Sequence, residues 1–263
     1  PRVRRQRQMC IRDREKYMRY NELTFQGRNA VLEAFRSGKT IDKLFILDGC
    51  QDGPIKSIVR EAKKTDAIIN YVDKERLDRL AGTGHHQGVV AIGAAYEYAE
   101  VEDILAAAKE KGEDPFIFIL DEIEDPHNLG AIIRTANLAG AHGVIIPKRR
   151  AVGLTATVAK TSAGAINYTP VAKVTNISQT IEELKKQGLW FVCADMGGET
   201  MYNLNLKGPI GLVIGNEGNG VSRLVKDKCD FIASIPMKGD IDSLNASVAA
   251  GVLAYEIVRQ RLN

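Results

Sequence analysis

The regular alternation of short apolar runs with amphipathic segments constrains the fold of this chain more than any other feature. From residue 115 onward, apolar runs predict strands at 116–121, 143–147, 168–174, 189–195, 210–215 and 231–237. The segments between and after them predict helices at 129–140, 155–164, 177–188 and 243–262. Because strands that alternate with helices form parallel sheets covered on both faces, we expect an α/β domain that binds its ligand at the carboxyl ends of its strands.

The chain before residue 115 divides into three segments of different character. Residues 21–95 predict a smaller α/β unit, with strands at 43–49, 67–72 and 87–94 and helices at 28–38, 54–64 and 73–82. Residues 96–114 are charged and alanine-rich, and we expect a helical linker there, ahead of the domain at 115–263. Residues 1–20 carry seven Arg and one Lys against two acidic residues, which indicates either a nucleic-acid-binding arm or a disordered or non-native extension.

Composition argues against several classes of protein. No apolar run among the 263 residues approaches the roughly 18 residues that span a bilayer, and no apolar segment follows the Arg-rich start, as a signal peptide would require. Four Cys residues lie far apart without a CxxC pair, which favours the reducing cytosol over a disulfide framework. His127 and His142 lack metal-ligand spacing and are interpreted as structural residues with satisfied hydrogen bonds. We therefore expect a cytoplasmic protein with no membrane partner and no metal ion.

A glycine-rich loop, GNEGNGVS at 215–222, follows the strand predicted at 210–215. Its glycines have the spacing of a phosphate-binding P-loop, but Val221 occupies the position of the lysine that would neutralise the phosphates. A dinucleotide-binding GxGxxG loop is excluded too, since Glu217 replaces its second glycine and would repel a pyrophosphate. The loop suits a ligand with a cationic group or hydroxyl donors, and the alternative is a tight left-handed turn with a solvated Glu217.

Two further polar loops follow predicted strands. In DPHNLGAIIRTANLAG, Asn128 is placed to cap a helix that begins near Leu129. Arg134 lies inside that otherwise apolar helix, where it either faces a cleft as an anion ligand or is a surface or ion-paired residue. In KGDIDSLNAS, Ser243 and Asn245 precede the last helix, and helix capping accounts for one of them better than for both.

These three loops, in this order, resemble the three motifs of the SpoU (TrmH-like) branch of the SPOUT RNA methyltransferases. The resemblance rests on HNLGAIIRTA, LVIGNEGNGVS and IPMKGDIDSLNASVAAGVLAYEIVRQR within residues 115–263. The stretches GRNAVLEAFRSG and GHHQGVVAIGA resemble the small L30e-like RNA-binding domain that precedes the catalytic domain in ribosomal RNA 2′-O-methyltransferases of this family. The likeness extends over nearly everything after residue 25 and is greatest to the bacterial 23S rRNA guanosine 2′-O-methyltransferases (RlmB-type).

The resemblance implies features that spacing and composition do not indicate. It implies that the C-terminal part of the catalytic α/β domain is threaded into a trefoil knot that holds S-adenosylmethionine, and that the protein works as a homodimer. Carried over position by position, the residues expected to hold the cofactor are Ile214, Gly215, Ile235, Met237 and Leu244.

The resemblance also implies five polar catalytic positions, which are Asn128, Arg134, Glu217, Ser243 and Asn245. Arg134 would act on a ribose 2′-hydroxyl, either as the base that is proposed in the family or, at lower energetic cost, as a cation that stabilises the developing alkoxide. Asn128 would orient the arginine or the ribose, while Ser243 and Asn245 would place the target nucleotide.

The expected function is therefore S-adenosylmethionine-dependent methylation of the ribose 2′-O of a guanosine in 23S rRNA, with RNA and not DNA as partner. The N-terminal unit and the basic run 148–150 would contact the RNA, although such a short run is equally typical of solvated surface. The same reaction on tRNA is one alternative, disfavoured by the whole α/β unit at the N-terminus. A non-catalytic RNA-binding protein is another, disfavoured by the five polar positions. A Rossmann-type methyltransferase or dehydrogenase would need its glycine-rich loop after the first strand.

Overall fold

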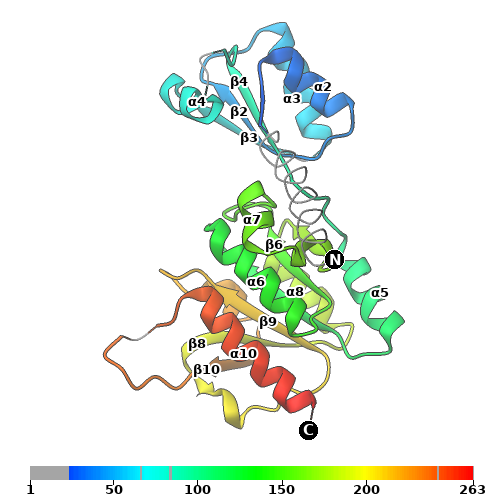
Figure 1. Ribbon diagram of the computed structural model, residues 1–263, viewed down its shortest axis with the longest axis vertical. Coiled ribbons are helices and arrows are strands. Elements are labelled where there is room, and N and C mark those ends of the chain that lie inside the picture. Colours follow the sequence, from blue (N-terminus) through cyan, green and yellow to red (C-terminus); the bar gives the residue numbers. More distant parts are fainter. Residues whose placement is uncertain (1–23, 66, 83–84, 242, 263) are drawn as a thin grey trace, which may run out of the picture. The chain divides into compact units, whose positions relative to one another are not determined.

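The computed structural model describes residues 24–65, 67–82, 85–241 and 243–262. The chain forms two compact units (Figure 1). The first contains the described residues up to Glu97 together with Gly153–Ala156, and the second contains Tyr98–Val152 and the chain from Thr157 onward. The basic segment 1–20 lies outside the described residues, so its interpretation stays a prediction.

The first unit is built on a four-stranded sheet in the order β1-β4-β2-β3. Strands β2 and β3 are parallel, and β4 is antiparallel to both β1 and β2. The core has two sides, because α2 and α3 pack on one face of the sheet and Leu77 of α4 packs on the other. In order, the elements are β1 Thr24–Gln26, α2 Arg28–Arg36, β2 Ile41–Leu47, α3 Gly53–Lys64, β3 Ile68–Val72, α4 Lys74–Ala81 and β4 Val89–Gly93.

The second unit is built on a six-stranded sheet in the order β10-β8-β9-β5-β6-β7, and every neighbouring pair is parallel. The parallel α/β sheet expected from the sequence is confirmed. The elements are α5 Val101–Lys111, β5 Phe116–Asp121, α6 Pro126–Leu138, β6 Gly143–Pro147, α7 Ala156–Thr161, the short 3₁₀ helix η1 Ala165–Asn167, β7 Val171–Val174, α8 Ile177–Lys185, β8 Trp190–Thr200, the 3₁₀ helix η2 Met201–Asn203, β9 Ile210–Gly215, α9 Arg223–Lys226, β10 Phe231–Ser234 and α10 Ala246–Arg261.

Helices cover both faces of this sheet. Ile117 and Ile119 of β5 join a buried core to which α5, α8 and α9 contribute side chains. The alternate residues Phe116, Phe118 and Leu120 are buried as well and point to the opposite face. There α10 packs against α6 and β9, and α6 and α10 lie side by side in Figure 1. Strand β5 is therefore central, and its carboxyl end is shielded from two sides.

The carboxyl half of β8 leaves its neighbours, and this opens the sheet. Pairing of β8 with β9 ends at Cys193 and Val213, whereas β9 stays paired with β5 as far as Gly215. On its other side, β8 pairs with β10 up to Cys193 and again only from Glu199, so residues 194–198 have no strand partner on β10. The gap lies at the carboxyl ends of parallel strands, which is where α/β sheets bind ligands. The trefoil knot implied by the resemblance stays a prediction.

Several predicted boundaries are wrong for reasons of helix capping. Helix α6 begins at Pro126 and not near Leu129, because Asp125 is its N-cap and accepts from the amides of His127 and Asn128. Helix α10 begins at Ala246 and not at residue 243, because Asn245 is its N-cap.

Four short elements, β1, α9, η1 and η2, lie outside the predicted strands and helices, since each is too short to show a periodicity. The segment 96–114 is more than a linker, because it contains α5, whose Ile104 is buried in the core of the second unit. Within the described part of the chain, no helix combines the length and the apolar character that a membrane span requires.

Candidate active site

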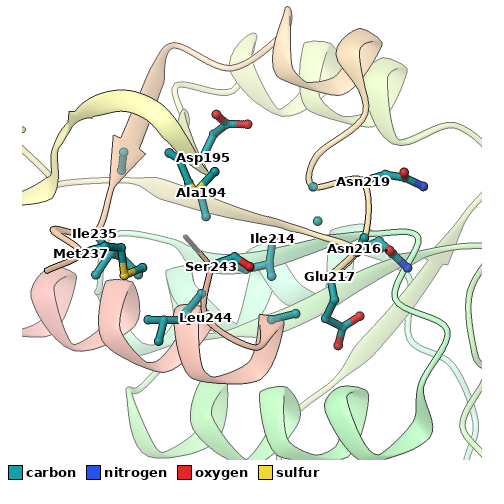
Figure 2. Close-up of a pocket in the computed structure, with 17 residues that line it drawn as sticks. Ala194, Asp195, Ile214, Asn216, Glu217, Asn219, Ile235, Met237, Ser243 and Leu244 are labelled. Carbon is teal, nitrogen blue, oxygen red and sulfur yellow. Dashed lines mark hydrogen bonds between the residues drawn. The ribbon is translucent and has the colours of Figure 1, made fainter. Parts of the chain in front are cut away.

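The gap beside β8 contains a cavity of about 410 Å³ at the carboxyl ends of β8, β9 and β10. Figure 2 shows Ile235 and Met237 at one end of this cavity and Glu217 with Asn219 at the other. The lining residues come from three stretches of chain, and they are Ala194, Asp195, Met196, Ile214, Gly215, Asn216, Glu217, Gly218, Asn219, Gly220, Ala233, Ile235, Met237, Ser243, Leu244, Ala246 and Ala249. The volume falls within the range of small-molecule and cofactor sites.

The loop 215–222 forms one wall of the cavity and is folded back on itself. Asn216 and Gly220 exchange backbone hydrogen bonds of 3.2 and 2.8 Å, and Gly220 has a φ of +66°. A Cβ at Gly215 would lie 2.1 Å from the carbonyl carbon of Gly220, so only glycine fits there. The side chain of Asn216 fastens the loop to β5 by donating to the carbonyl of Glu122 (3.1 Å). The loop is therefore a tight turn whose backbone forms a wall of the cavity.

The lining suits a cationic ligand with an apolar part. It includes two acidic residues, Asp195 and Glu217, and no Lys, Arg or His. Aliphatic and thioether side chains, among them Ile214, Ile235 and Leu244, cover much of the remaining surface. A di- or triphosphate would meet no cation here, which agrees with the exclusion of a P-loop from the sequence.

Three polar side chains, one from helix α6 and two from separate loops, meet at the Glu217 edge of the cavity. Asn128 donates through Nδ2 to Oε1 of Glu217. Asn245 donates through Nδ2 to Oδ1 of Asn128 (3.0 Å) and to Oε1 of Glu217 (3.5 Å). Asn128 is buried, although the sequence predicted it at the first turn as a cap for backbone amides. Its side chain instead joins α6 to the other two loops, and that prediction of its contacts is wrong.

The side-chain amides of Asn128 and Asn245 can each be oriented in only one way, because hydrogen bonds to neighbouring residues distinguish the oxygen from the nitrogen. Ser247 donates to Oδ1 of Asn245 from its backbone amide (2.9 Å) and from its hydroxyl (2.6 Å). The Nδ2 group of Asn245 must therefore face Asn128, whose own Nδ2 faces Glu217. Among the residues that the structure describes, Oε2 of Glu217 has no hydrogen-bond partner, so it remains available as an acceptor. Sequence reasoning missed Ser247, which stands two residues after a capping Asn.

The predicted site residues differ in whether they lie at the cavity. All five residues predicted to hold the cofactor line the cavity, and so do Glu217 and Ser243. Asn128 and Asn245 lie against Glu217. Arg134 is not brought into this network, since it is exposed on α6, and no ion pair to it occurs between described residues.

Sequence reasoning also missed the acidic residue on the β8 side of the cavity. Oδ2 of Asp195 pairs with Lys226 of α9, and its Oδ1 accepts from the amide of Gly197 (3.0 Å). The pKa of Asp195 is lowered, chiefly by the hydrogen bond from Lys226. The only signal in the sequence was an acid in the last part of a predicted strand, which is common and not specific.

The remaining candidates of the sequence have simpler roles. In the basic run 148–150, Lys148 is half-buried and Arg150 pairs with Glu122 (2.8 Å), so Arg149 is the one that extends freely into solvent. His142 is buried and bonded on both ring nitrogens, which confirms its interpretation as structural. His127 is exposed instead, and its ring has no hydrogen-bond partner among the described residues, which contradicts its interpretation as a structural residue with satisfied hydrogen bonds. Within the described ranges, no three His, Cys, Asp or Glu residues come together as metal ligands would.

Comparison with known proteins agrees with the fold and with the site. Residues 115–255 match the SpoU rRNA Methylase family, and residues 26–99 match the family described as RNA 2′-O ribose methyltransferase substrate binding. YacO of Bacillus subtilis (strain 168), which is assigned to the TrmH family of tRNA/rRNA methyltransferases, is 53% identical over 236 residues, or 89% of this chain and 94% of YacO.

Two solved structures are similar as well. An rRNA methyltransferase from Sinorhizobium meliloti has a TM-score of 0.58 and 24% identity, with 92% of this chain and 90% of that one covered. A TrmH/SpoU tRNA modifying enzyme from A. aeolicus has a TM-score of 0.52 and 29% identity, with 57% of this chain and 77% of that one covered.

The fold and the cavity define an α/β enzyme that binds a small cationic cofactor at the carboxyl ends of parallel strands. The chain belongs to the SpoU (TrmH) family of RNA methyltransferases. Enzymes of this class take their methyl group from S-adenosylmethionine, whose sulfonium and adenosine fit a cavity with acidic and apolar walls and no basic side chain.

Proposed function

We propose that this enzyme methylates the ribose 2′-oxygen of a guanosine in 23S rRNA. The observation that carries the proposal is the network of Asn128, Glu217 and Asn245, which presents a carboxylate oxygen beside the cofactor cavity. A free carboxylate acceptor suits a hydroxyl donor and repels a phosphate. Ribosomal RNA is favoured over tRNA because the first unit matches a substrate-binding domain, and the A. aeolicus tRNA enzyme covers only 57% of this chain.

In this proposal Ile214, Gly215, Ile235, Met237 and Leu244 hold the cofactor. The bare backbone at Gly215 allows close approach, and the apolar side chains pack on the adenine. When bound, S-adenosylmethionine supplies an electrophilic methyl group on a positively charged sulfur. Glu217 and Asp195 make the cavity electrostatically suited to that charge.

The chain must orient a 2′-hydroxyl and accommodate its proton, since a neutral hydroxyl is a poor nucleophile. Oε2 of Glu217 accepts the hydrogen bond of the 2′-hydroxyl, while Asn128 and Asn245 hold the carboxylate in place through Oε1. Ser243, which lines the same cavity, contacts the target nucleotide. A bound cofactor would supply the methyl group to the 2′-oxygen and would leave as the neutral thioether, while Glu217 or solvent would receive the hydroxyl proton.

Arg134 stabilises the developing alkoxide and the phosphate next to it. Its side chain is exposed on α6, so a substrate or a second copy of the chain can reach it. Arginine remains protonated at neutral pH, and for that reason an electrostatic role is favoured over a role as base.

The enzyme acts as a homodimer in this proposal. Two apolar side chains of α10, Val248 and Tyr255, are exposed together with its C-cap Leu262, and spacings of seven residues place them along one side of the helix. Leu138 on the neighbouring α6 is exposed too, one helical turn after Arg134. Burial of this surface against a second copy would remove four large apolar side chains from water. Sedimentation of the full chain tests this, and a species of one chain at all concentrations contradicts it.

The test of the substrate is transfer of tritium from labelled S-adenosylmethionine to unmodified 23S rRNA and, in parallel, to bulk tRNA, with nuclease mapping of the product. Label in a 2′-O-methylguanosine of 23S rRNA is the expected result. Label in tRNA would show that tRNA is the substrate instead. Absence of cofactor binding by calorimetry would refute the assignment as a methyltransferase. Arg134→Ala is expected to bind the cofactor with unchanged affinity and to lose turnover about 10²–10³-fold. Near-normal turnover of that variant would refute the role of Arg134.

A further inference from the structure

The first unit presents one helix whose charge is strongly unbalanced. The exposed side of α3 carries four basic residues, Lys56, Arg60, Lys63 and Lys64, against the single acid Glu61. Its net charge of +3 is the largest of any helix in the described part of the chain. We name these four residues the α3 basic face. The sequence pattern predicts a helix there and does not distinguish this basic segment from the run at 148–150.

The spacing of the α3 basic face gathers its charges on one side of the helix. Residues 56, 60 and 64 follow one another at intervals of four, and Lys63 lies beside them, one turn after Arg60. At 1.5 Å per residue the row is about 12 Å long. A nucleic-acid backbone presents several phosphates over such a length. The side chains also enclose a shallow hollow, lined by Lys56, Val59, Arg60, Lys63 and Lys64.

Few of these charges are neutralised within the protein. Lys64 pairs with Glu61 (3.0 Å), and Nε of Arg60 lies 3.9 Å from the same carboxylate. Lys56 and Lys63 have no ion pair with any described residue. The side chains of Arg60 and Lys64 are 72% and 63% exposed. Because two of its four charges are unpaired among the described residues and the other two share a single acid, the face can exchange counterions for phosphates.

The helix beneath the α3 basic face is held firmly. Ile55, Ile58 and Ala62 are buried against α2 and the sheet. Asp52 is the N-cap, accepts from the amide of Ile55 (3.2 Å) and pairs with Arg28 (2.5 Å). The basic side chains are therefore fixed at their bases and free at their ends, which limits the ordering needed on binding.

We infer that the α3 basic face binds the phosphate backbone of the RNA substrate. The inference rests on the proposed RNA methyltransferase function and adds the surface by which the first unit holds the substrate. Contacts to phosphates by Lys and Arg position a protein on RNA without reading the base sequence. The face would accordingly contribute affinity and orientation, and the cavity of the second unit would select the nucleotide.

Helix α4 of the same unit provides a matched control. It also has three exposed basic residues, Lys74, Arg76 and Arg79, but Glu75 and Asp78 alternate with them. Removal of three positive charges from either helix changes the net charge of the protein equally. Only the α3 change removes a concentrated positive surface.

The experiment compares the full-length chain with two triple variants in filter binding to an unmodified 23S rRNA transcript at several salt concentrations. One variant combines Lys56→Gln, Arg60→Gln and Lys63→Gln. The other combines the corresponding three Gln substitutions on α4. The α3 variant is expected to bind the transcript roughly ten- to a hundredfold more weakly, with the slope of log affinity against log salt reduced by about 2. The α4 variant should differ from the wild type by less than about threefold.

Separate readouts keep this inference apart from the proposed function. Calorimetric binding of S-adenosylmethionine and thermal unfolding should be unchanged in both variants, because α3 lies outside the cavity and its basic side chains are exposed. Wild-type affinity and salt slope in the α3 variant overturn the inference, as do equal losses in the two variants. The inference is also overturned if the α3 variant loses binding to phosphatidylglycerol vesicles but still binds the transcript, because the α3 basic face would then bind lipid. Failure of the wild type to bind the cofactor would instead refute the methyltransferase.

Discussion

The two ends of the six-stranded sheet use polar side chains in opposite ways. At the amino end, Arg261 donates to the carbonyls of Asp114 and Pro115 (both 3.1 Å) and of Gly208, and its guanidinium lies 5.2 Å from the centre of the Phe116 ring. His142 accepts from the amide of Phe116 (3.0 Å) through Nδ1 and contacts Glu113 through Nε2. Apart from Nε of Arg261, which is buried without a hydrogen-bond partner among the described residues, these side chains bind backbone groups and Glu113, and their role is to close the fold.

At the carboxyl end, the polar side chains form hydrogen bonds mainly with one another, and one hydrogen-bond acceptor is left without a partner among the described residues. Asn128 of α6 converges with Glu217 and Asn245 from two loops, yet Oε2 of Glu217 accepts no hydrogen bond from any described residue. The comparison teaches that a satisfied buried polar group indicates structure, whereas a positioned group with a spare donor or acceptor beside a cavity indicates chemistry. Changes at the carboxyl end should alter catalysis, and changes at the amino end should alter stability.

The largest effect is expected for Glu217→Gln. The substitution keeps the size of the side chain but removes the charge that accepts the substrate hydroxyl. Turnover should fall about 10²–10³-fold, while the melting temperature changes little. Tritium transfer under saturating cofactor measures the rate. Asp195→Asn is the control, since this acid also lines the cavity but is paired with Lys226. Similar losses of turnover in the two variants would show that general charge in the cavity, and not Glu217, is responsible.

The second effect is the loss of cofactor affinity in Gly215→Ala. The new methyl group would lie within 2.2 Å of three backbone atoms of Gly220 and Val221, so the loop must move away from β9. Overpacking of this kind costs about 1–3 kcal/mol, which corresponds to a roughly ten- to hundredfold weaker binding of S-adenosylmethionine in calorimetry. A Cβ at Gly239 would meet nothing within 4 Å, and Gly239→Ala should bind almost normally. Equal affinities of the two variants would contradict the proposed close approach of the backbone.

The third effect tests the amino end through Arg261→Ala. The change leaves the carbonyls of Asp114 and Gly208 without this donor, leaves that of Pro115 with only the amide of Ile210, and removes a cation from the face of Phe116. Stability should fall by about 2–3 kcal/mol in urea unfolding, with cofactor affinity unchanged in the folded protein. Arg223→Ala, at a side chain that is 93% exposed, is the control and should have no measurable effect. A selective loss of cofactor affinity in Arg261→Ala would contradict the assignment of stability to the amino end and of catalysis to the carboxyl end.

The smallest effect is a pH dependence caused by His142. Burial lowers the pKa of this imidazole below its ordinary value of 6.5, and the nearby Glu113 offsets the shift only in part. As the pH falls below 6.5, the unfolded chain binds a proton that the folded protein excludes, so stability decreases as the pH falls. The melting temperature should drop by a few degrees between pH 7.5 and 5.5, and His142→Gln should be less stable at pH 7.5 but show a smaller drop. An identical drop in both proteins would assign the dependence to other groups.

Much of the second unit could be predicted from the sequence because its signals are local. Apolar runs predict every strand of the six-stranded sheet. The residues of the glycine-rich loop after β9 argue against a phosphate-binding P-loop without any knowledge of the geometry. All five residues expected to hold the cofactor line the cavity. The predictions that were wrong concern Asn128, whose buried contacts come from residues 89 and 117 positions away in the chain, and His127, whose exposure depends on what packs against α6.

The sequence by itself determined the alternation of strands and helices, the parallel sheet and the three polar loops at its carboxyl end, because periodicity and turn chemistry operate over a few neighbouring residues. Only the tertiary structure decided where β8 leaves its partners, how the amide groups of Asn128 and Asn245 point, and which of several basic segments forms a concentrated face. These properties arise from pairings between distant parts of the chain. Their energies depend on register and on the burial of one element by another, and neither is encoded in a local pattern.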